Sequence, residues 1–462
     1  KKNSLRTMIV FQFAILFTII SSGLGRVFVV DNTSQQDKAD GSVGSPFKTI
    51  QDCVNALKTI GKPGDECQIR AGQYHENVKI DNLQGTPNQP FMIRGYGDER
   101  PKIDGTIPIF PAIDPETGDR YDWKTLSEDS KIYKTKINQD IWQLFVNNQM
   151  MTNARWPNAK WSDRSIFKGS LWAKLDNASK KGYMVNKGRS LAQTNINMTN
   201  AVAVLNIGSF NTFVAKVEDH QAGQNWFNYK DTFNNDKFKP SISKYFIEDK
   251  LELLDTPEEW FYNQETKTLY VWMPNGDSPR DHELRGKVQT YAMEITNTHN
   301  LVLKNLDFFA TAISAISSRS ENIDGVKFDS LIFNYPTYSK RMLGDISLIK
   351  LIRALGRSRR NYGSFVFFNN TFYGSDGATL DVNGFNVTYD NNLWEYNDWT
   401  GANMLTFNGG EGPINTYARN EVYYRNTFRY NDASTSIQPG LNPRIILNHV
   451  GGPYKMMAPV FI

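Results

Sequence analysis

The sequence has 462 residues, of which 40% are hydrophobic and 13% aromatic, which is enough for one large core or two ordinary ones. This composition excludes a disordered chain. The formal net charge of +4 does not suggest the basic face that nucleic-acid binding requires, so we expect no nucleic-acid partner.

The first segment, KKNSLRTMIVFQFAILFTIISSGLG, is typical of a secretory signal peptide. It has a basic start, an apolar run from Met8 to Ile20, and small residues up to Gly25. The apolar run is shorter than the roughly 20 residues that span a bilayer, which argues against a membrane anchor. We therefore expect a signal peptide at residues 1–25, a secreted, extracellular protein, and no membrane association after cleavage.

Secretion changes how the cysteines are interpreted. Cys53 and Cys67 enclose a short loop, and in an oxidising compartment we expect them to form a disulfide. Five N-x-[ST] motifs are compatible with glycosylation during export. The acceptor residues are Asn32, Asn177, Asn197, Asn369 and Asn386.

Residues 26–106 are predicted to form an N-terminal cap and the first coils of a β-structure. In SPFKTIQDCVNALKTIG, Ser45 can cap an amphipathic helix that Gly61 ends. The next stretch, GDECQIRAGQYHENVKI, contains the short alternating runs of half-buried strands. Because these strands lead to turns and not to hairpins, we expect the helix to cover an open end of the structure.

Residues 107–289 break this pattern and are predicted to form an inserted, β-sandwich-like module. The stretches QLFVNNQMMTNARWPN and DKLELLDTPEEWFYNQETKTLYVWMPNGD have strand and turn character without a coil period. Within the second, the runs EEWFYN and TLYVWMP flank a QETK turn, which predicts a hairpin.

Residues 290–462 are repetitive. The fragments NNTFYGSD, NNLWEYND and RNTFRYND each place an asparagine two residues before an aromatic residue. The interval from Asn370 to Asn392 is 22 residues, and that from Asn392 to Asn426 is 34, which fits one ordinary coil and one with an inserted loop. A period in the low twenties built from short β-runs predicts a parallel β-helix. We expect asparagine ladders and aromatic stacks along it.

The chain stops at GGPYKMMAPVFI, with apolar residues at its end and no closing element. Since solenoids need a polar cap at each end, we expect the coils to be C-terminally incomplete.

A resemblance to known proteins extends from about Val27 to the end. The opening GSVGSPFKTIQDCVNAL and the following MIRGYGDERPKIDG resemble the N-terminal coils of secreted β-helix proteins of the pectate-lyase-like superfamily. FVNNQMMTNARWPN, together with LELLDTPEEWFYNQETKTLYVWMP, resembles the insertion of β-xylosidase-like glycoside hydrolases. The resemblance implies an all-β fold: a right-handed parallel β-helix with an N-terminal capping helix and an inserted β-sandwich-like module.

Three aspartates recur at one offset in the repeats. Asp376, Asp398 and Asp432 each follow an aromatic residue by four positions. Equivalent residues of successive β-helix coils lie about 4.8 Å apart, close to the roughly 5–5.5 Å between the carboxyl groups of retaining glycosidases. Two such close carboxylates cannot both ionise easily, so one would act as general acid and the other as charged nucleophile.

The resemblance implies an acidic pair on neighbouring coils in this region, and Asp376 best matches the nucleophile. The acid of such enzymes is typically a glutamate, whereas the equivalent coil here offers Asp398. We predict Asp398 as the acid, followed in order by Glu411 and Glu395. The residues predicted to bind or position a polysaccharide or oligosaccharide are Asp381, Asp432, Trp399, Tyr338, Lys340 and Arg341.

Several alternatives remain open. The aspartates could be turn residues whose side chains bond the local backbone, or they could hold calcium, which takes six to eight oxygens. The protein could be a polysaccharide lyase that uses calcium and Lys340 or Arg341, or a non-catalytic glycan-binding solenoid. The hydrolase hypothesis itself requires no cofactor and no metal.

Overall fold

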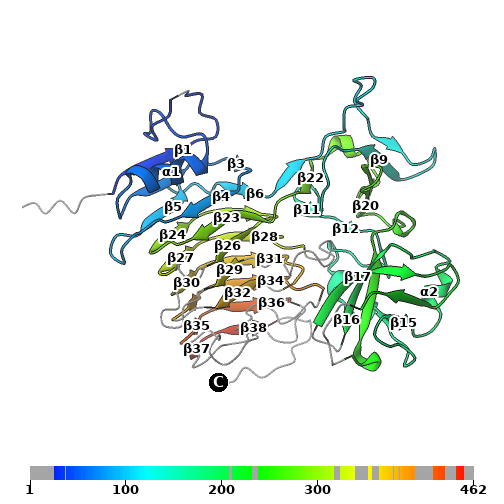
Figure 1. Ribbon diagram of the computed structural model, residues 1–462. Helices are drawn as coiled ribbons and strands as arrows, with labels where there is room; N and C mark the ends of the chain where they lie inside the picture. Colours follow the sequence, from blue (N-terminus) through cyan, green and yellow to red (C-terminus); the bar gives the residue numbers. More distant parts are fainter. Residues whose placement is uncertain are drawn as a thin grey trace, which may run out of the picture.

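The protein is nearly all β: in the described residues, α-helix is confined to α1 (Ile50–Ile60) and α2 (Ser190–Gln193) (Figure 1). None of the described helices is long and apolar enough to cross a membrane. The computed structural model describes residues 25–36, 38–207, 211–231, 238–316, 323–338, 352–355, 364–377, 379–383, 386–400, 420–431 and 444–451.

Three parallel sheets build one arm of the molecule, and the chain visits them in turn as a stack of coils (Figure 1). The first sheet runs β1 (Val27–Val30), β2 (Glu66–Ile69), β5 (Phe91–Gly95), β24 (Leu301–Lys304), β27 (Val326–Asp329), β30 (Phe365–Phe368), β33 (Thr388–Asp390), β35 (Val422–Tyr424), β37 (Arg444–Ile446). The second runs β3 (Gln73–Tyr74), β6 (Lys102–Asp104), β25 (Asp307–Phe309), β28 (Ile332–Asn334), β31 (Thr371–Tyr373), β34 (Leu393–Glu395), β36 (Thr427–Arg429), β38 (His449–Gly451). The third runs β32 (Leu380–Asn383), β29 (Ile352–Leu355), β26 (Ala312–Ile316), β23 (Tyr291–Thr296), β4 (Val78–Asp81).

The coils turn at residues with left-handed backbone conformation that recur at equivalent places. Asn391 (φ 57°) turns the chain between β33 and β34, and Tyr396 (φ 53°) turns it after β34. Gly374 (φ 76°) holds the latter corner one coil earlier, where a Cβ would lie 2.7 Å from the Tyr335 ring. Asparagine and glycine tolerate this conformation best, which suits Asn391 and Gly374 to these corners.

A buried asparagine ladder runs beside the first of these corners. The Nδ2 of Asn370 donates to Oδ1 of Asn392, that of Asn392 to Asn426, and that of Asn426 to Asn448, each at 2.9 Å. The Asn392 Nδ2 also donates to the Phe367 carbonyl oxygen at 2.9 Å. These bonds confirm the predicted ladder and satisfy amides that would otherwise be costly to bury.

Aromatic rings stack along the inside of the same coils, as predicted. Neighbouring rings of one stack have centroids 4.6–5.5 Å apart, and those of the other have centroids 4.7–5.1 Å apart. The first stack consists of Phe308, Phe333, Phe372, Trp394 and Phe428, and the second of Phe328, Phe367, Tyr389 and Tyr423. The apolar core therefore carries the same repeat as the backbone.

Replacing Asn392 with alanine is expected to lower the free energy of unfolding by at least about 2 kcal/mol, because it leaves several buried groups without partners. Chemical denaturation would measure the change. Asn391→Gly is the matched control: it removes an exposed amide bonded to Asn369 and keeps a residue suited to positive φ. Equal losses in both variants would contradict a stabilising role for the buried ladder.

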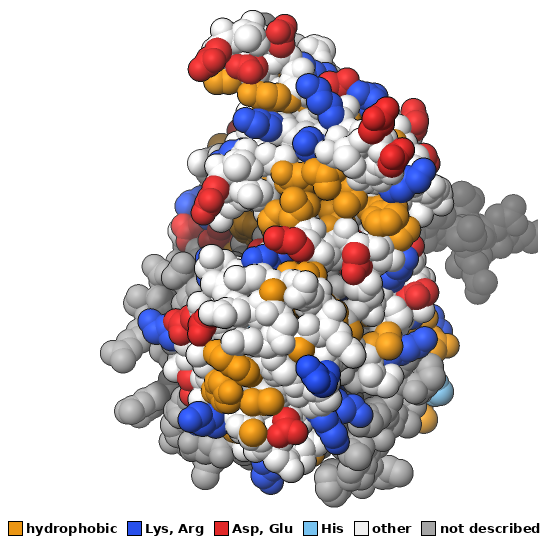
Figure 2. Space-filling view, turned by 90° about the vertical axis from the view of Figure 1, so that its right-hand side faces the viewer, with side chains coloured by type: hydrophobic (Ala, Val, Ile, Leu, Met, Phe, Trp, Pro, Cys, Tyr) orange, Lys and Arg blue, Asp and Glu red, His pale blue; other side chains and the backbone are white. Residues whose placement is uncertain are grey.

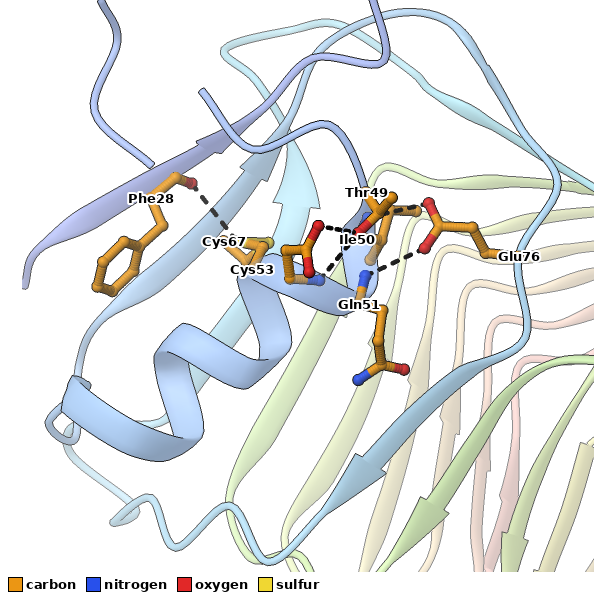
Figure 3. Close-up of a disulfide and its surroundings, with 8 residues drawn as sticks. Phe28, Thr49, Ile50, Gln51, Cys53, Cys67 and Glu76 are labelled. Atoms are coloured by element: carbon orange, nitrogen blue, oxygen red, sulfur yellow. Dashed lines mark hydrogen bonds between the residues drawn. A yellow bond between two sulfur atoms is a disulfide. The ribbon is translucent and has the colours of Figure 1, made fainter. Parts of the chain in front are cut away.

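Helix α1 covers the open end of the stack but begins later than predicted (Figure 3). Its N-cap is Thr49, not Ser45, because the Thr49 hydroxyl accepts a hydrogen bond from the Asp52 N–H at 3.0 Å. The Glu76 carboxylate accepts hydrogen bonds from the first two N–H groups of the helix, those of Ile50 and Gln51, at 2.9 and 3.1 Å. The upstream residue Phe47 instead forms a parallel bridge with Val30 of β1.

The predicted disulfide between Cys53 and Cys67 is present (Figure 3). Cys53 lies on α1 and Cys67 on β2, and both side chains are fully buried. The bond therefore fixes the helix to the first sheet. A crosslink that closes a short loop stabilises by about 3 kcal/mol in the chain-entropy account.

Between β7 (Thr106–Pro108) and β22 (Leu284–Lys287) the chain forms three further, mainly antiparallel sheets. The predicted hairpin is confirmed as β20 (Glu259–Asn263) and β21 (Thr268–Trp272). The first two sheets run β11 (Gln149–Met150), β10 (Leu144–Val146), β22 (Leu284–Lys287), β7 (Thr106–Pro108), and β12 (Thr152–Asn153), β20 (Glu259–Asn263), β21 (Thr268–Trp272), β9 (Ile132–Lys136), β8 (Lys124–Thr125). The third runs β13 (Arg155–Trp156), β19 (Lys244–Glu248), β16 (Val202–Ile207), β17 (Asn211–Asp219), β18 (Trp226–Tyr229), β15 (Tyr183–Val185), with β14 (Ala173–Lys174) beside β19. Short 3-10 turns lie at Ser165–Phe167, Gly169–Leu171, Pro240–Ile242, Leu251–Leu253 and Pro279–Asp281.

Candidate active site at the junction of coils and inserted strands

The inserted strands lie beside the coils (Figure 1), and an apolar cluster joins the two. A hydrogen bond at 2.9 Å from the Thr212 hydroxyl on β17 to the Thr400 carbonyl oxygen adds a polar contact. The cluster takes Phe145, Met150, Ala159, Trp161, Ile166 and Phe167 from the insertion, and Phe309, Ala310, Tyr335, Tyr338 and Trp399 from the coils. The junction is therefore a packed interface, and the predicted aromatic residues Tyr338 and Trp399 belong to it.

Asp376 and Asp398 occupy equivalent places on neighbouring coils. Strands β31 and β34 pair in parallel with Phe372 opposite Trp394. Because each aspartate follows its aromatic residue by four positions, the two aspartates lie at equivalent points of the two coils. The backbone pairing continues past the strands, where the Asp398 N–H donates to the Ser375 carbonyl oxygen at 2.8 Å. The repeat period had predicted this adjacency.

Both aspartates are enclosed, with 0% of Asp376 and 1% of Asp398 exposed. Asp398 also has a left-handed backbone (φ 59°), a conformation that aspartate tolerates better than most residues. The turn interpretation of the repeated aspartates thus has a local basis at Asp398. It accounts for the backbone there, but not for the burial of two carboxyl groups on adjacent coils, which is costly unless they are compensated.

The described structure surrounds Asp376 with specific partners. Its Oδ1 accepts a hydrogen bond at 2.7 Å from the hydroxyl of Thr337, which follows β28. Lys287, the last residue of β22, lies close enough for the Asp376 charge to act on it. Burial lowers the pKa of the Lys287 ammonium to about 7, while the carboxylate of Asp376 opposes that fall.

Sequence reasoning missed Lys287. All four residues of β22 are buried, so there is no alternation of exposed and buried positions to mark this lysine as unusual. Its partner lies on a distant coil, and no local motif connects the two. The burial that makes this lysine unusual is visible in the structure and not in the sequence.

The predicted aromatic contacts, Tyr338 and Trp399, are both 2% exposed, and their ring centroids lie 6.2 Å apart. Tyr338 follows Thr337, and Trp399 follows Asp398. They therefore flank the aspartate pair from two coils, but they are packed side chains and do not form an open stacking platform.

A second buried charge cluster lies on the inserted side. Arg155 of β13 is 1% exposed, and burial lowers its pKa to about 10, opposed by the charges of Glu248, Glu259 and Tyr338. Burial, reinforced by Asp255, raises the pKa of Glu259 to about 9. Arg155 opposes the rise in the Glu259 pKa, but the effect of burial is larger.

The other predicted site residues are not brought together by the described structure. Asp381 lies on β32 in the third sheet. Four of the five predicted glycosylation acceptors are exposed, and Asn32 is half-buried. The residues Glu411, Asp432, Lys340 and Arg341, together with the side chain of Asp381, lie outside the described residues.

The described part of the chain contains no cluster of three or more histidine, cysteine, aspartate or glutamate residues arranged to hold a metal ion. A groove of about 560 Å³ is lined mainly by apolar residues, among them Phe110 and Ile113, and also by Arg120, Asn138 and Gln139. It contains no carboxyl group and is separate from the aspartate pair. Figure 2 shows the face formed by the insertion, on which acidic and basic side chains are interspersed.

No family model matches the chain, and no curated protein matches it. A solved structure described as a glycoside hydrolase is 12% identical, with a TM-score of 0.51 over 93% of this chain and 96% of that one. The xylose complex of XylC is 12% identical (TM-score 0.43, 93% and 64% covered), and a lacto-N-biosidase from Eubacterium ramulus is 9% identical (TM-score 0.30, 93% and 55% covered). At these identities the first similarity concerns the fold alone, and the other two are too distant to support an argument.

Proposed function

We propose that the protein is a secreted glycoside hydrolase that cleaves polysaccharide or oligosaccharide bonds with Asp376 as nucleophile and Asp398 as general acid. The observation that carries the proposal is the placement of these carboxyl groups at equivalent positions of adjacent coils, both buried at the junction with the insertion. One strand spacing is about 4.8 Å, which suits the two-step retaining route.

The proposal includes the fold and location that the sequence suggested. The coils would form a right-handed parallel β-helix of the pectate-lyase-like type, with a β-sandwich-like insertion at residues 107–289. The signal peptide at residues 1–25 would direct the protein out of the cell, where the five asparagine acceptors could carry glycans.

In the first step, Asp376 would attack the anomeric carbon while Asp398 protonates the leaving oxygen, and water would then release the sugar with Asp398 as base. Because neither carboxyl group is exposed, a sugar can reach them only after the groups that cover them move. Exclusion of water by the same enclosure would strengthen the charge interactions within the site.

The test is a screen of purified protein against aryl glycosides and plant and algal polysaccharides, with two readouts. The proposal predicts new reducing ends without an unsaturated product. An unsaturated product that disappears with a chelator would instead establish a lyase. Binding without any product would establish a glycan-binding solenoid.

A further inference from the structure

Lys287 is a buried lysine supplied by the inserted segment. The residue ends β22, is 1% exposed, and donates from Nζ to the Pro336 carbonyl oxygen at 2.8 Å. A carbonyl oxygen cannot balance the charge of a buried ammonium, which is costly without a counter-ion. The group that opposes the burial effect on Lys287 is Asp376, which belongs to the coils.

Two consecutive residues contact these two side chains. The Pro336 carbonyl oxygen accepts the hydrogen bond from Lys287, and the hydroxyl of the next residue, Thr337, donates to Asp376. Thr337 is fully buried. The short turn after β28 therefore contacts both side chains through adjacent residues.

Without a cation, a fully buried carboxylate tends to take up a proton, and a protonated carboxyl group is a poor nucleophile. We infer that Lys287 is a positioning residue that brings positive charge to the enclosed Asp376 carboxyl group, so that the inserted segment contributes to the electrostatics of the catalytic coil. This inference rests on the proposed function for its catalytic meaning, but the pairing of the two charges does not.

A double-mutant cycle measured by thermal unfolding tests the pairing without an assay of activity. Lys287→Met, Asp376→Asn and the double variant are compared with the wild type. Lys287→Met should lower the melting temperature clearly when Asp376 is present and much less when Asn replaces it. Equal losses in the two backgrounds would overturn the inference.

The matched control is the surface pair of Lys267 and Asp140, whose side chains are 47% and 36% exposed. The equivalent cycle with Lys267→Met and Asp140→Asn should show little coupling, because solvent screens that pair. Coupling at the surface as large as at Lys287 would count against a special role for the buried pair.

Kinetics then test the catalytic meaning. In the described part of the chain, the titratable groups near Asp376 include Lys287 from the insertion and Asp398 on the next coil. In Lys287→Met the acidic limb of the kcat/KM profile should move up by about 1–3 pH units, and Lys287→Arg should restore it in part. A lower melting temperature with an unchanged profile would overturn the inference. Coupling in the unfolding cycle with no wild-type hydrolysis would instead reject only the proposed function.

Discussion

Replacing Asp376 with asparagine is expected to lower kcat/KM on the responsive glycoside by more than about 10³-fold while the protein still unfolds cooperatively. An amide accepts the hydrogen bond from Thr337 as a carboxylate does, but it cannot form the covalent bond to the sugar. Steady-state kinetics and a thermal melt on the same preparation would measure the two quantities.

Asp398→Asn is the companion variant, with an expected loss of roughly 10²–10⁴-fold, the usual contribution of a general acid. The loss should be smallest for substrates with good leaving groups, which need little protonation. Asp390→Asn is the matched control, because Asp390 belongs to the same coil but pairs with Arg425 on the outer face. Full activity in both Asp376→Asn and Asp398→Asn would reject the catalytic role and leave the aspartates with a structural role in the turns.

Glu259→Gln is expected to stabilise the protein relative to the wild type as the pH rises. The folded-state pKa of Glu259, about 9, lies above its ordinary value of 4.5, so folding takes up a proton between these values. The folded state then binds more protons than the unfolded state, and stability falls with rising pH. Glutamine does not titrate, so the variant should gain on the order of 3 kcal/mol over the wild type between pH 5 and pH 8.

Denaturant unfolding at several pH values would measure this difference, and the subtraction removes titrations that both proteins share. Glu265→Gln at the exposed turn of the β20–β21 hairpin is the control and should show a flat difference. A flat difference for Glu259→Gln would mean that the carboxyl group is ionised in the fold, with Arg155 as its effective counter-ion.

The repeats are the part of the fold that the sequence predicted best, because the same kinds of side chain pack at the same positions of successive coils. Asn392 and Trp394 recur at fixed offsets since their neighbours need a matching amide and a matching ring. These residues define the register of the coils, and that register places Asp376 beside Asp398. The spacing of the repeats was therefore enough to predict the aspartate pair.

The features that sequence reasoning missed depend on contacts between distant segments. Helix α1 begins after Thr49 and not after Ser45, and Glu76, on the following coil, accepts hydrogen bonds from the first two helical N–H groups. Lys287 and Arg155 are buried beside acidic residues that are far away in the chain, and burial lowers the pKa of each. No periodicity encodes such pairings, so only the assembled structure displays them.

The most direct test of the account is to trap the glycosyl-enzyme with a 2-deoxy-2-fluoro glycoside of the sugar that the screen identifies, followed by peptide mass spectrometry. The account predicts one equivalent of label on Asp376, together with retention of the anomeric configuration during normal turnover. Inversion of configuration, or a label on a residue other than Asp376, would contradict it.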